Sequence, residues 1–167
     1  MATLAADHLA SAAGGYVPQL TNNFFLYLNG VAGAENIRLA TEAAFLPKES
    51  NTVLKLGFGN EEVKFAGSAH WDAGSLTIRD MIDKDMYGIL IAWRRSVYDP
   101  TTGNVGVPAA YKKTARLVLT APDNSIVRQF QLTGLWPSDL TPGNLSYNNS
   151  THLTIAVTCQ YDKALAA

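Results

Sequence analysis

Apolar and polar residues alternate along much of the chain, which is the pattern of half-buried β-strands. The alternation recurs in the runs 23–28, 53–56, 61–65, 75–79, 114–120, 126–133 and 152–161. A further strand is predicted over 37–45, ending before Pro47, which cannot donate to a strand ladder. Turn residues such as the pair Asn29–Gly30 separate the runs. The pattern therefore predicts seven or eight strands.

The last of these runs has the clearest two-sided pattern. Its apolar face comprises Leu153, Ile155, Val157, Cys159 and Tyr161. Its polar face comprises His152, Thr154, Thr158 and Gln160. In an antiparallel sheet such a strand turns its apolar face to the core and its polar face to water.

The stretch from Thr52 to Ala66 predicts a hairpin, because two alternating arms flank a tip whose glycines permit positive φ. The residues expected at or near this tip are Leu54, Leu56, Gly57, Phe58, Gly59, Asn60, Glu61 and Glu62. On the sequence alone, an ordinary surface hairpin is the favoured interpretation.

One segment changes from the period of two to a helical period. Its apolar residues recur at spacings of three and four, at Ile82, Met86, Ile89, Leu90, Trp93 and Val97. We expect Asp80 or Asp83 to cap the first turn. Asp99 should end the helix, because the residue before a proline disfavours the α conformation. We expect no other helix, and a loop over 101–110.

These elements predict a mainly β fold. The expected architecture is a closed or nearly closed β-barrel or sandwich, with one helix packed on its side and one long projecting hairpin. Residues 1–22 are rich in Ala and carry little periodicity, so we interpret them as an N-terminal arm. Residues 23–167 then form a single domain of ordinary size.

The chain is poor in charge for its length. Of its 167 residues 47% are hydrophobic and only 16% are charged, against roughly 25% charged in typical soluble domains. Part of the surface is therefore expected to be buried against other subunits, although a lightly charged monomer is the alternative. The net charge of −1 and the absence of a basic block argue against tight nucleic-acid binding.

The single cysteine, Cys159, cannot form an intramolecular disulfide, which suits a reducing compartment. No apolar run is long enough to span a bilayer, and the first residues lack the pattern of a signal peptide. We therefore expect a soluble protein of the cytoplasm, without a membrane partner.

The inventory of catalytic residues is nearly empty, and we predict neither an enzyme nor a bound metal or cofactor. His70 and Asp72 share one strand face and could form a hydrogen bond, but a solvated or interface histidine is the favoured reading. Cys159 lies on an apolar strand face, as a small core residue would. Trp71 and Trp136 could present a carbohydrate or peptide platform, although core or interface positions are commoner for such residues.

Several segments, taken together and in order, resemble the tail tube proteins of contractile-tailed bacteriophages. They follow the hairpin tip and comprise Trp71, the helix residue Trp93, the run Tyr111, Lys112 and Lys113, and the run Gly134, Leu135, Trp136 and Pro137. The resemblance covers roughly 45–162 and extends to tube proteins of type VI secretion systems and extracellular contractile injection systems.

The resemblance implies a subunit of six-membered rings that stack into a hollow tube. Such a tube lies in the virion tail, is assembled in the host cytoplasm, and conducts DNA that transits the lumen without specific binding. The implied partners are further copies of the chain, the tail sheath, the tape-measure protein, the baseplate and the tail terminator. A glycan- or peptide-binding β-sandwich and a tube of a non-phage injection system are the alternatives.

The resemblance also suggests roles for particular surfaces. The hairpin is the candidate for contact with the adjacent ring. A lumen should be neutral or acidic, because a wall of Lys and Arg would hold DNA tightly. The candidate lumen residues are Glu62, Lys64, Thr154, Thr158 and Gln160. Arg94 and Arg95 are left for acidic partners such as a surrounding sheath.

Overall fold

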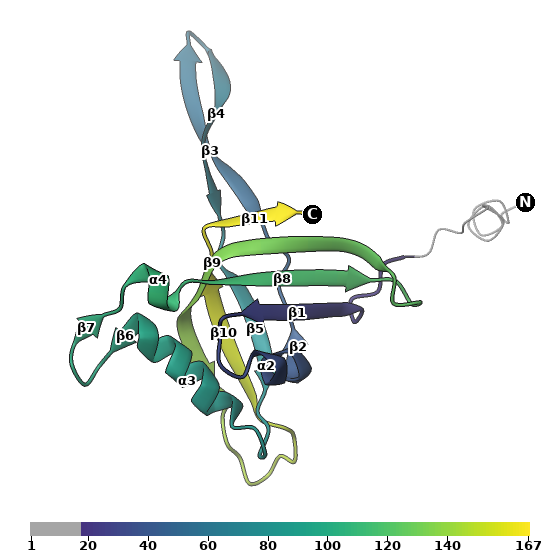
Figure 1. Cartoon of the computed structure of the whole chain (residues 1–167). Coiled ribbons are helices and arrows are strands. Elements are labelled where there is room, and N and C mark those ends of the chain that lie inside the picture. Colours follow the sequence, from purple (N-terminus) through teal and green to yellow (C-terminus); the bar gives the residue numbers. More distant parts are fainter. Residues whose placement is uncertain (1–17) are drawn as a thin grey trace, which may run out of the picture.

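The computed structural model describes residues 18–167, so the expected N-terminal arm over 1–22 lies mostly outside the described part. The strands are β1 (Phe24–Asn29), β2 (Thr41–Ala43), β3 (Glu49–Phe58), β4 (Glu61–Trp71), β5 (Gly74–Arg79), β6 (Tyr98–Asp99), β7 (Asn104–Val105), β8 (Lys113–Thr120), β9 (Ile126–Pro142), β10 (Thr154–Gln160) and β11 (Lys163–Ala166). The helices are α2 (Ala34–Ala40), α3 (Met86–Val97) and α4 (Pro108–Tyr111) (Figure 1).

A curled antiparallel sheet forms the body, with the strand order β1-β8-β9-β10-β5-β2 and with β11 added beside β9. The long strand β9 joins its two halves: the first part pairs with β8 and β11, and the part after Leu135 pairs with β10. Helix α3 packs along β9 (Figure 1). The predicted fold, mainly β with a packed helix and a projecting hairpin, is confirmed.

Because the strands alternate, every second side chain points to the inner side of the curled sheet. In β10, Ile155, Val157 and Cys159 are completely buried, so the apolar face predicted for this strand is confirmed. Helix α3 adds four buried residues to the same core, namely Met86, Leu90, Trp93 and Val97. The core therefore lies between the curled sheet and α3.

The strand predicted over 37–45 is wrong in its first half, because this segment begins as α2 and becomes strand only at Thr41. Gly33 precedes the helix with φ 78°, a left-handed conformation that glycine adopts without strain. Ile37 and Ala40, three positions apart, are the residues that α2 buries. In a helix of two turns the hydrophobic periodicity is too short to distinguish a helix from a strand.

The predicted start of α3 is also wrong. Asp85, not Asp80 or Asp83, caps the helix by accepting a hydrogen bond from the Gly88 N–H at 2.9 Å. Ile82 consequently lies before the helix and is fully exposed, whereas the other five predicted face residues are buried or half-buried.

Further elements differ from the expectation, among them the short paired strands β6 and β7. Helix α4 begins within the predicted loop over 101–110, and β11 follows the last predicted strand. Strand β9 does not stop at Thr133 but continues to Pro142. At Pro137, β9 pairs with only one of the described strands, β10. Its other edge has no partner among these strands there, so a residue without an N–H is tolerated.

Candidate assembly surfaces

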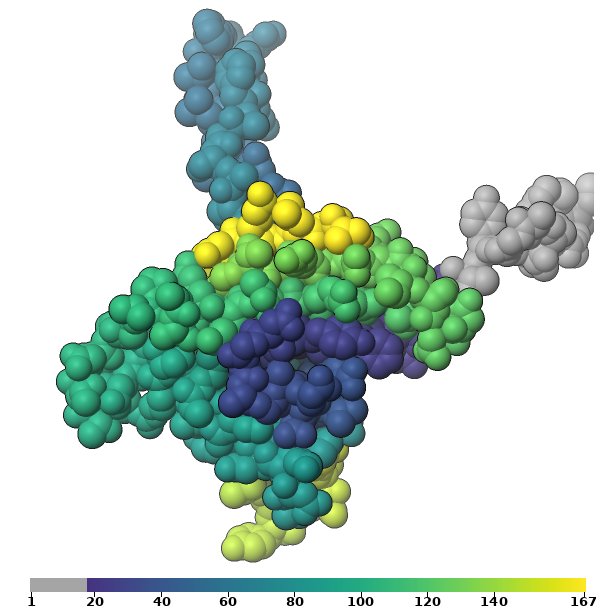
Figure 2. Space-filling view, viewed as in Figure 1, coloured from purple at the N-terminus to yellow at the C-terminus, as the bar shows by residue number. Residues whose placement is uncertain are grey.

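The hairpin β3–β4 stands clear of the body of the molecule (Figures 1 and 2). Its strands have 10 and 11 residues, longer than predicted. At about 3.3 Å per residue the hairpin extends for about 33 Å. The described residues between Asn51 and His70 are all exposed, so burial within one copy stabilises the hairpin much less than it stabilises the body.

One face of the hairpin is apolar. The register pairs Leu54 with Phe65, Leu56 with Val63, and Phe58 with Glu61. Directly paired residues of an antiparallel ribbon point to the same side, so these apolar side chains form one continuous patch. Phe58, at its outer end, is 67% exposed.

The opposite face of the hairpin is charged. Here Lys55 pairs with Lys64 and Gly57 pairs with Glu62. The Glu62 carboxylate lies between the two ammonium groups, 3.5 Å from Lys55 Nζ and 3.9 Å from Lys64 Nζ. The candidate lumen residues Glu62 and Lys64 thus share a face, as predicted from their alternation.

At its base the hairpin is tied to the body by polar contacts around Asp72. The Lys48 ammonium lies 2.7 Å from Asp72 Oδ2, and this hydrogen bond lowers the pKa of Asp72. Ser50 donates to Asp72 Oδ1 at 3.3 Å and lies 3.0 Å from His70 Nε2. The base therefore connects both strands of the hairpin to the segment that leads into β5.

These residues do not have the arrangement of a catalytic triad. His70 Nε2 is 3.6 Å from Asp72 Oδ1, too far for the hydrogen bond that the sequence suggested. The same ring nitrogen faces both Ser50 and Asp72, whereas a triad needs the carboxylate on the other nitrogen of the ring.

An aromatic cluster lies just inside the hairpin base. The Trp71 and Tyr161 rings are 5.9 Å apart, and Phe45 stacks on Tyr161 at 5.5 Å. The Tyr161 hydroxyl accepts a hydrogen bond from the Lys48 N–H at 3.1 Å. Trp71 is therefore engaged in anchoring the hairpin to the core rather than in forming an open platform.

The two runs that carry the resemblance most specifically meet in space. Trp93 Nε1 donates to the Tyr111 carbonyl at 3.0 Å, and the Tyr111 ring meets Trp136 edge-on at 5.7 Å. Lys112 Nζ lies 2.7 Å from Asp162 Oδ2. These contacts join α3, α4, β9 and the end of β10.

Gly134 belongs to the same junction. Its φ of 70° is left-handed, and a Cβ at this position would collide with the Asp162 carboxylate. Its neighbours Leu135 and Pro137 are buried. The motif residues other than Trp71 thus meet at one structural junction. Its carboxylate, Asp162, was not singled out from the sequence because a lone exposed aspartate has no local pattern.

The outer face of the β5–β10 sheet is polar, and its charged residues are of both signs: Arg79 is paired with Thr154, and Asp139 with Thr158. Thr154 and Thr158 of β10 project there, as does Gln160 beyond the bulge. In the register, Thr158 lies between Ser75 and Asp139. The structure therefore brings three candidate lumen residues onto one wall, while Glu62 and Lys64 lie on the hairpin.

Arg94 and Arg95 line a groove of about 250 Å³ between α3 and β9, together with Tyr87 and Tyr98. Arg95 is exposed, and Arg94 is half-buried with a buried Nη1 that has no hydrogen-bond partner among the described residues. Two guanidinium groups beside two phenols suit a carboxylate-bearing segment.

Within residues 18–167 no group of His, Cys, Asp and Glu side chains is placed to hold a metal ion. Burial raises the pKa of the Cys159 thiol to about 12, which is the behaviour of an inert core residue. Among the described helices, none has the length and apolar character needed to cross a membrane.

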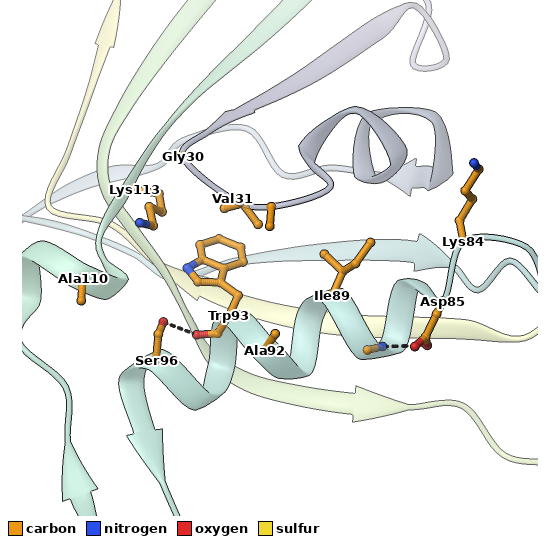
Figure 3. A pocket seen from close by; sticks show the side chains of 12 residues that line it. Gly30, Val31, Lys84, Asp85, Ile89, Ala92, Trp93, Ser96, Ala110 and Lys113 are labelled. Atoms are coloured by element: carbon orange, nitrogen blue, oxygen red, sulfur yellow. Dashed lines mark hydrogen bonds between the residues drawn. The ribbon is translucent and has the colours of Figure 1, made fainter.

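A furrow beside α3 was missed from the sequence. It has a volume of about 510 Å³ and lies between α3 and the β1–α2 loop at Gly30–Ala32 (Figure 3). Trp93, Ile89 and Val31 line it, and its two lysines are Lys84 and Lys113. The helical period of α3 identified its buried face, but the position of the loop over that helix depends on tertiary packing.

No protein-family model matches the chain, and no curated protein matches it significantly. Solved structures do match. A chain in the extended sheath–tube complex of PVC, an extracellular contractile injection system, has a TM-score of 0.70 at 13% identity, covering 98% of this chain and 97% of that chain.

Two other matches agree with it. A chain from the tube-terminating cap of the anti-feeding prophage has a TM-score of 0.71 at 14% identity, covering 90% of this chain and 91% of that chain. A type six secretion system protein has a TM-score of 0.52 at 10% identity, covering 86% and 81%. The fold resemblance to tube proteins of contractile systems, which the sequence suggested, is confirmed.

Proposed function

We propose that this chain is the structural subunit of a hollow tail tube, in which rings of six copies stack along one axis. The observation that carries the proposal is the hairpin β3–β4, whose apolar residues Leu54, Leu56 and Phe58 are exposed beyond the body. An isolated two-stranded ribbon is at best marginally stable in water, so this one needs a partner surface. A match that spans nearly the whole chain supports a further copy as that partner.

Ring formation accounts for the sheet edges. Among the described strands, β1, β2 and β11 each pair with one neighbour in the sheet and have one edge without a strand partner. Unpaired edges invite further strands, and a closed ring of copies satisfies them without unlimited growth in that direction. We take six as the number of copies, and the baseplate structure among the matches was symmetrised six-fold. Residues 23–167 are the ring-forming domain in this proposal.

We place the polar wall of Thr154, Thr158 and Gln160 towards the lumen, with Glu62 and Lys64 continuing it along the hairpin. A wall of hydroxyl and amide groups releases no counterions from a passing nucleic acid and so does not retain it. This suits DNA that transits without specific binding, and it equally suits a tape-measure protein.

We place the outer partners at the groove between α3 and β9, which Asp139 also lines. We assign the Arg94–Arg95 groove to an acidic segment of a surrounding sheath, because Arg95 is exposed there and Arg94 lies beside it. PVC was solved as a sheath–tube complex, and the anti-feeding prophage matches include a baseplate and a cap. A sheath, a baseplate and a tube terminator are accordingly the partners we propose.

The particle is either a phage tail in the virion, assembled in the host cytoplasm, or an extracellular injection particle. The sequence resemblance favours the phage, whereas the structural matches to PVC and the anti-feeding prophage favour the injection particle. Nuclease-protected DNA in tubes isolated from their source would support the phage; protein cargo without DNA would support the injection particle.

A binding module is the competing function, and the structure gives it little support. It needs Trp71 or Trp136 as an open platform, yet Trp71 packs on Tyr161 and Trp136 on Tyr111. Light scattering and negative-stain microscopy of the purified chain test the proposal. Rings or hollow tubes are expected; a chain that stays monomeric at high concentration, also with the baseplate added, would contradict it.

A further inference from the structure

The tip of the hairpin combines an apolar ring with a carboxylate. Phe58 and Glu61 are paired directly, so both side chains leave the ribbon on the same side. Glu61 forms no ion pair with any described residue, whereas its neighbour Glu62 is held between Lys55 and Lys64. The surface that receives this tip should therefore offer an apolar hollow with a positive charge beside it.

The furrow beside α3, defined above, has this composition. Figure 3 shows the Trp93 indole under Val31 in the middle of the furrow, with Ile89 further along the helix. Trp93 is only 5% exposed and its indole N–H is bonded to the Tyr111 carbonyl, so it contributes a largely buried apolar floor and no donor. Val31 and Ile89 are half-buried and offer the apolar surface that a partner can reach. The floor is completed by Ala92, whose short side chain leaves the furrow open.

Lys113 supplies the charge beside the indole. Its side chain lies over Gly30, where a Cβ would come within 3.8 Å of Lys113 Nζ. Lys84 lies at the far end of the furrow (Figure 3). Lys113 forms no ion pair within the described part of the chain, so its charge remains available to a partner carboxylate.

The other hollows of the body fit the tip less well. One of about 600 Å³, between β1 and the β2 segment, is apolar but is lined by Glu42 and by no lysine or arginine. The carboxylate of Glu61 would meet another carboxylate there.

The Arg94–Arg95 groove has the right charge but only about 250 Å³ of volume. The hollow of about 390 Å³ beside Arg116 has a positive charge but a mainly polar lining, which does not suit the Phe58 ring. Asp85 also lines the furrow, but its carboxylate accepts the Gly88 N–H at the start of α3, at the end of the furrow away from Lys113 (Figure 3). Charge and size together therefore favour the Lys113 end of the furrow.

The direction of the two surfaces is also compatible. In Figure 1 the hairpin leaves the body on one side of the β8–β9 layer, and α3 lies on the other side. A donor and an acceptor at opposite ends make a head-to-tail contact, which repeats without limit along an axis. The hairpin, about 33 Å long, can extend well into a neighbouring copy.

We infer that Phe58 of one copy inserts into the furrow beside α3 of a copy in the adjacent ring, with Glu61 next to Lys113. This rests on the proposed function, since it names the acceptor for the stacking hairpin. The contact buries the ring of Phe58 against Trp93 and Ile89. It also places the carboxylate of Glu61 beside the ammonium group of Lys113, neither of which has an ion-pair partner among the described residues. The register between adjacent rings is thereby fixed.

Disulfide trapping tests the inference. Phe58→Cys combined with Ala92→Cys should form an intermolecular disulfide in assembled tubes, giving a ladder of oligomers on a non-reducing gel. The native thiol Cys159 does not interfere, because it is fully buried. The matched control is Phe58→Cys with Ala156→Cys, an exposed alanine on the β10 wall, which should give no ladder.

The outcomes separate this inference from the proposed function. Tubes of the unmodified chain with no ladder from the Ala92→Cys pair would overturn the inference and leave the proposed function standing. Absence of tubes from the unmodified chain would overturn both. A ladder with Ala43→Cys, in the hollow near Glu42, in place of Ala92→Cys would assign the tip to that hollow instead.

Charge reversal decides the matter if the cysteine pair fails to assemble. Glu61→Lys should raise the concentration needed for tubes about tenfold, the change that a loss of about 1.4 kcal/mol produces. Adding Lys113→Glu should restore assembly, whereas Arg128→Glu, a reversal elsewhere on the surface, should not. Failure of Lys113→Glu to rescue would contradict the inferred contact.

Discussion

The body and the hairpin share the same alternation of apolar and polar residues. The apolar residues of the body are buried within one copy, whereas those of the hairpin are exposed. Ile155 and Val157 of β10 are completely buried, while Leu54 and Phe58 of β3 are more than half exposed. Burial stabilises by about 25 cal/mol per Å² of apolar surface. The body obtains this within one copy, whereas the hairpin can obtain it only from another. One residue type can therefore serve folding in one region and assembly in the other.

A matched pair of leucines gives the largest expected contrast. Leu76 in β5 is 1% exposed and Leu56 in the hairpin is 44% exposed. Leu76→Ala should lower the free energy of unfolding by about 2–5 kcal/mol, because it leaves a cavity. Leu56→Ala should change it by less than about 0.5 kcal/mol while weakening tube formation. Urea unfolding with a sedimentation assay measures both, and similar unfolding losses would contradict the contrast.

Two glycines with left-handed backbone sharpen the comparison. Gly134 in the body and Gly59 at the hairpin tip have φ of 70° and 63°. Gly134→Ala also meets the Asp162 carboxylate, whereas a Cβ at Gly59 meets nothing. We expect losses of roughly 1–3 kcal/mol for Gly134→Ala and about 1 kcal/mol for Gly59→Ala in denaturant unfolding. The loss should be larger for Gly134→Ala, and a loss no larger than that of Gly59→Ala would contradict the predicted clash with Asp162.

The buried thiol gives the body a pH dependence that the hairpin lacks. Burial raises the pKa of Cys159 from 9.0 to about 12. Above pH 9 the unfolded chain loses this proton while the folded chain keeps it, so stability falls as the pH rises towards 12. The contribution is about 1.4 kcal/mol per pH unit. Cys159→Ala should flatten the stability profile over this range, and an unchanged slope would contradict the assignment.

The smallest contrast concerns two exposed ion pairs. Lys112 joins Asp162 in the body, and Lys55 joins Glu62 in the hairpin. Lys112→Met should cost up to about 1 kcal/mol and Lys55→Met about 0.2 kcal/mol, because exposed pairs contribute little. Thermal unfolding at low and high salt measures both. A larger loss in the hairpin would mean that its charges matter before assembly.

The elements predicted correctly from the sequence are those in which the periodicity of apolar residues matches the residues that are buried in the structure. The faces of β10 and of α3 after Met86 follow from periodicity alone, and so does the hairpin. Helix α2 was mistaken for strand because Ile37 and Ala40 give only one helical repeat. The continuation of β9 through Pro137 was missed because it depends on having β10 as its only strand partner there among the described strands.

The candidate surfaces were predictable to a lesser extent. The exposed tip of the hairpin and the polar wall of β10 follow from alternation along one strand. The furrow beside α3 brings together Val31, Trp93 and Lys113 from three parts of the chain. Local sequence patterns cannot predict that such distant residues lie close together. The Asp162 contact with Lys112 was missed for the same reason.

The central claim is that the hairpin serves contact between copies and not the fold of one copy. Negative-stain microscopy of the intact chain and of a variant lacking Gly57–Asn60, both checked for folding by circular dichroism, tests this claim most directly. We predict stacked tubes from the intact chain, and folded protein that stops at single rings from the variant. Tubes of ordinary length from the variant would contradict the account.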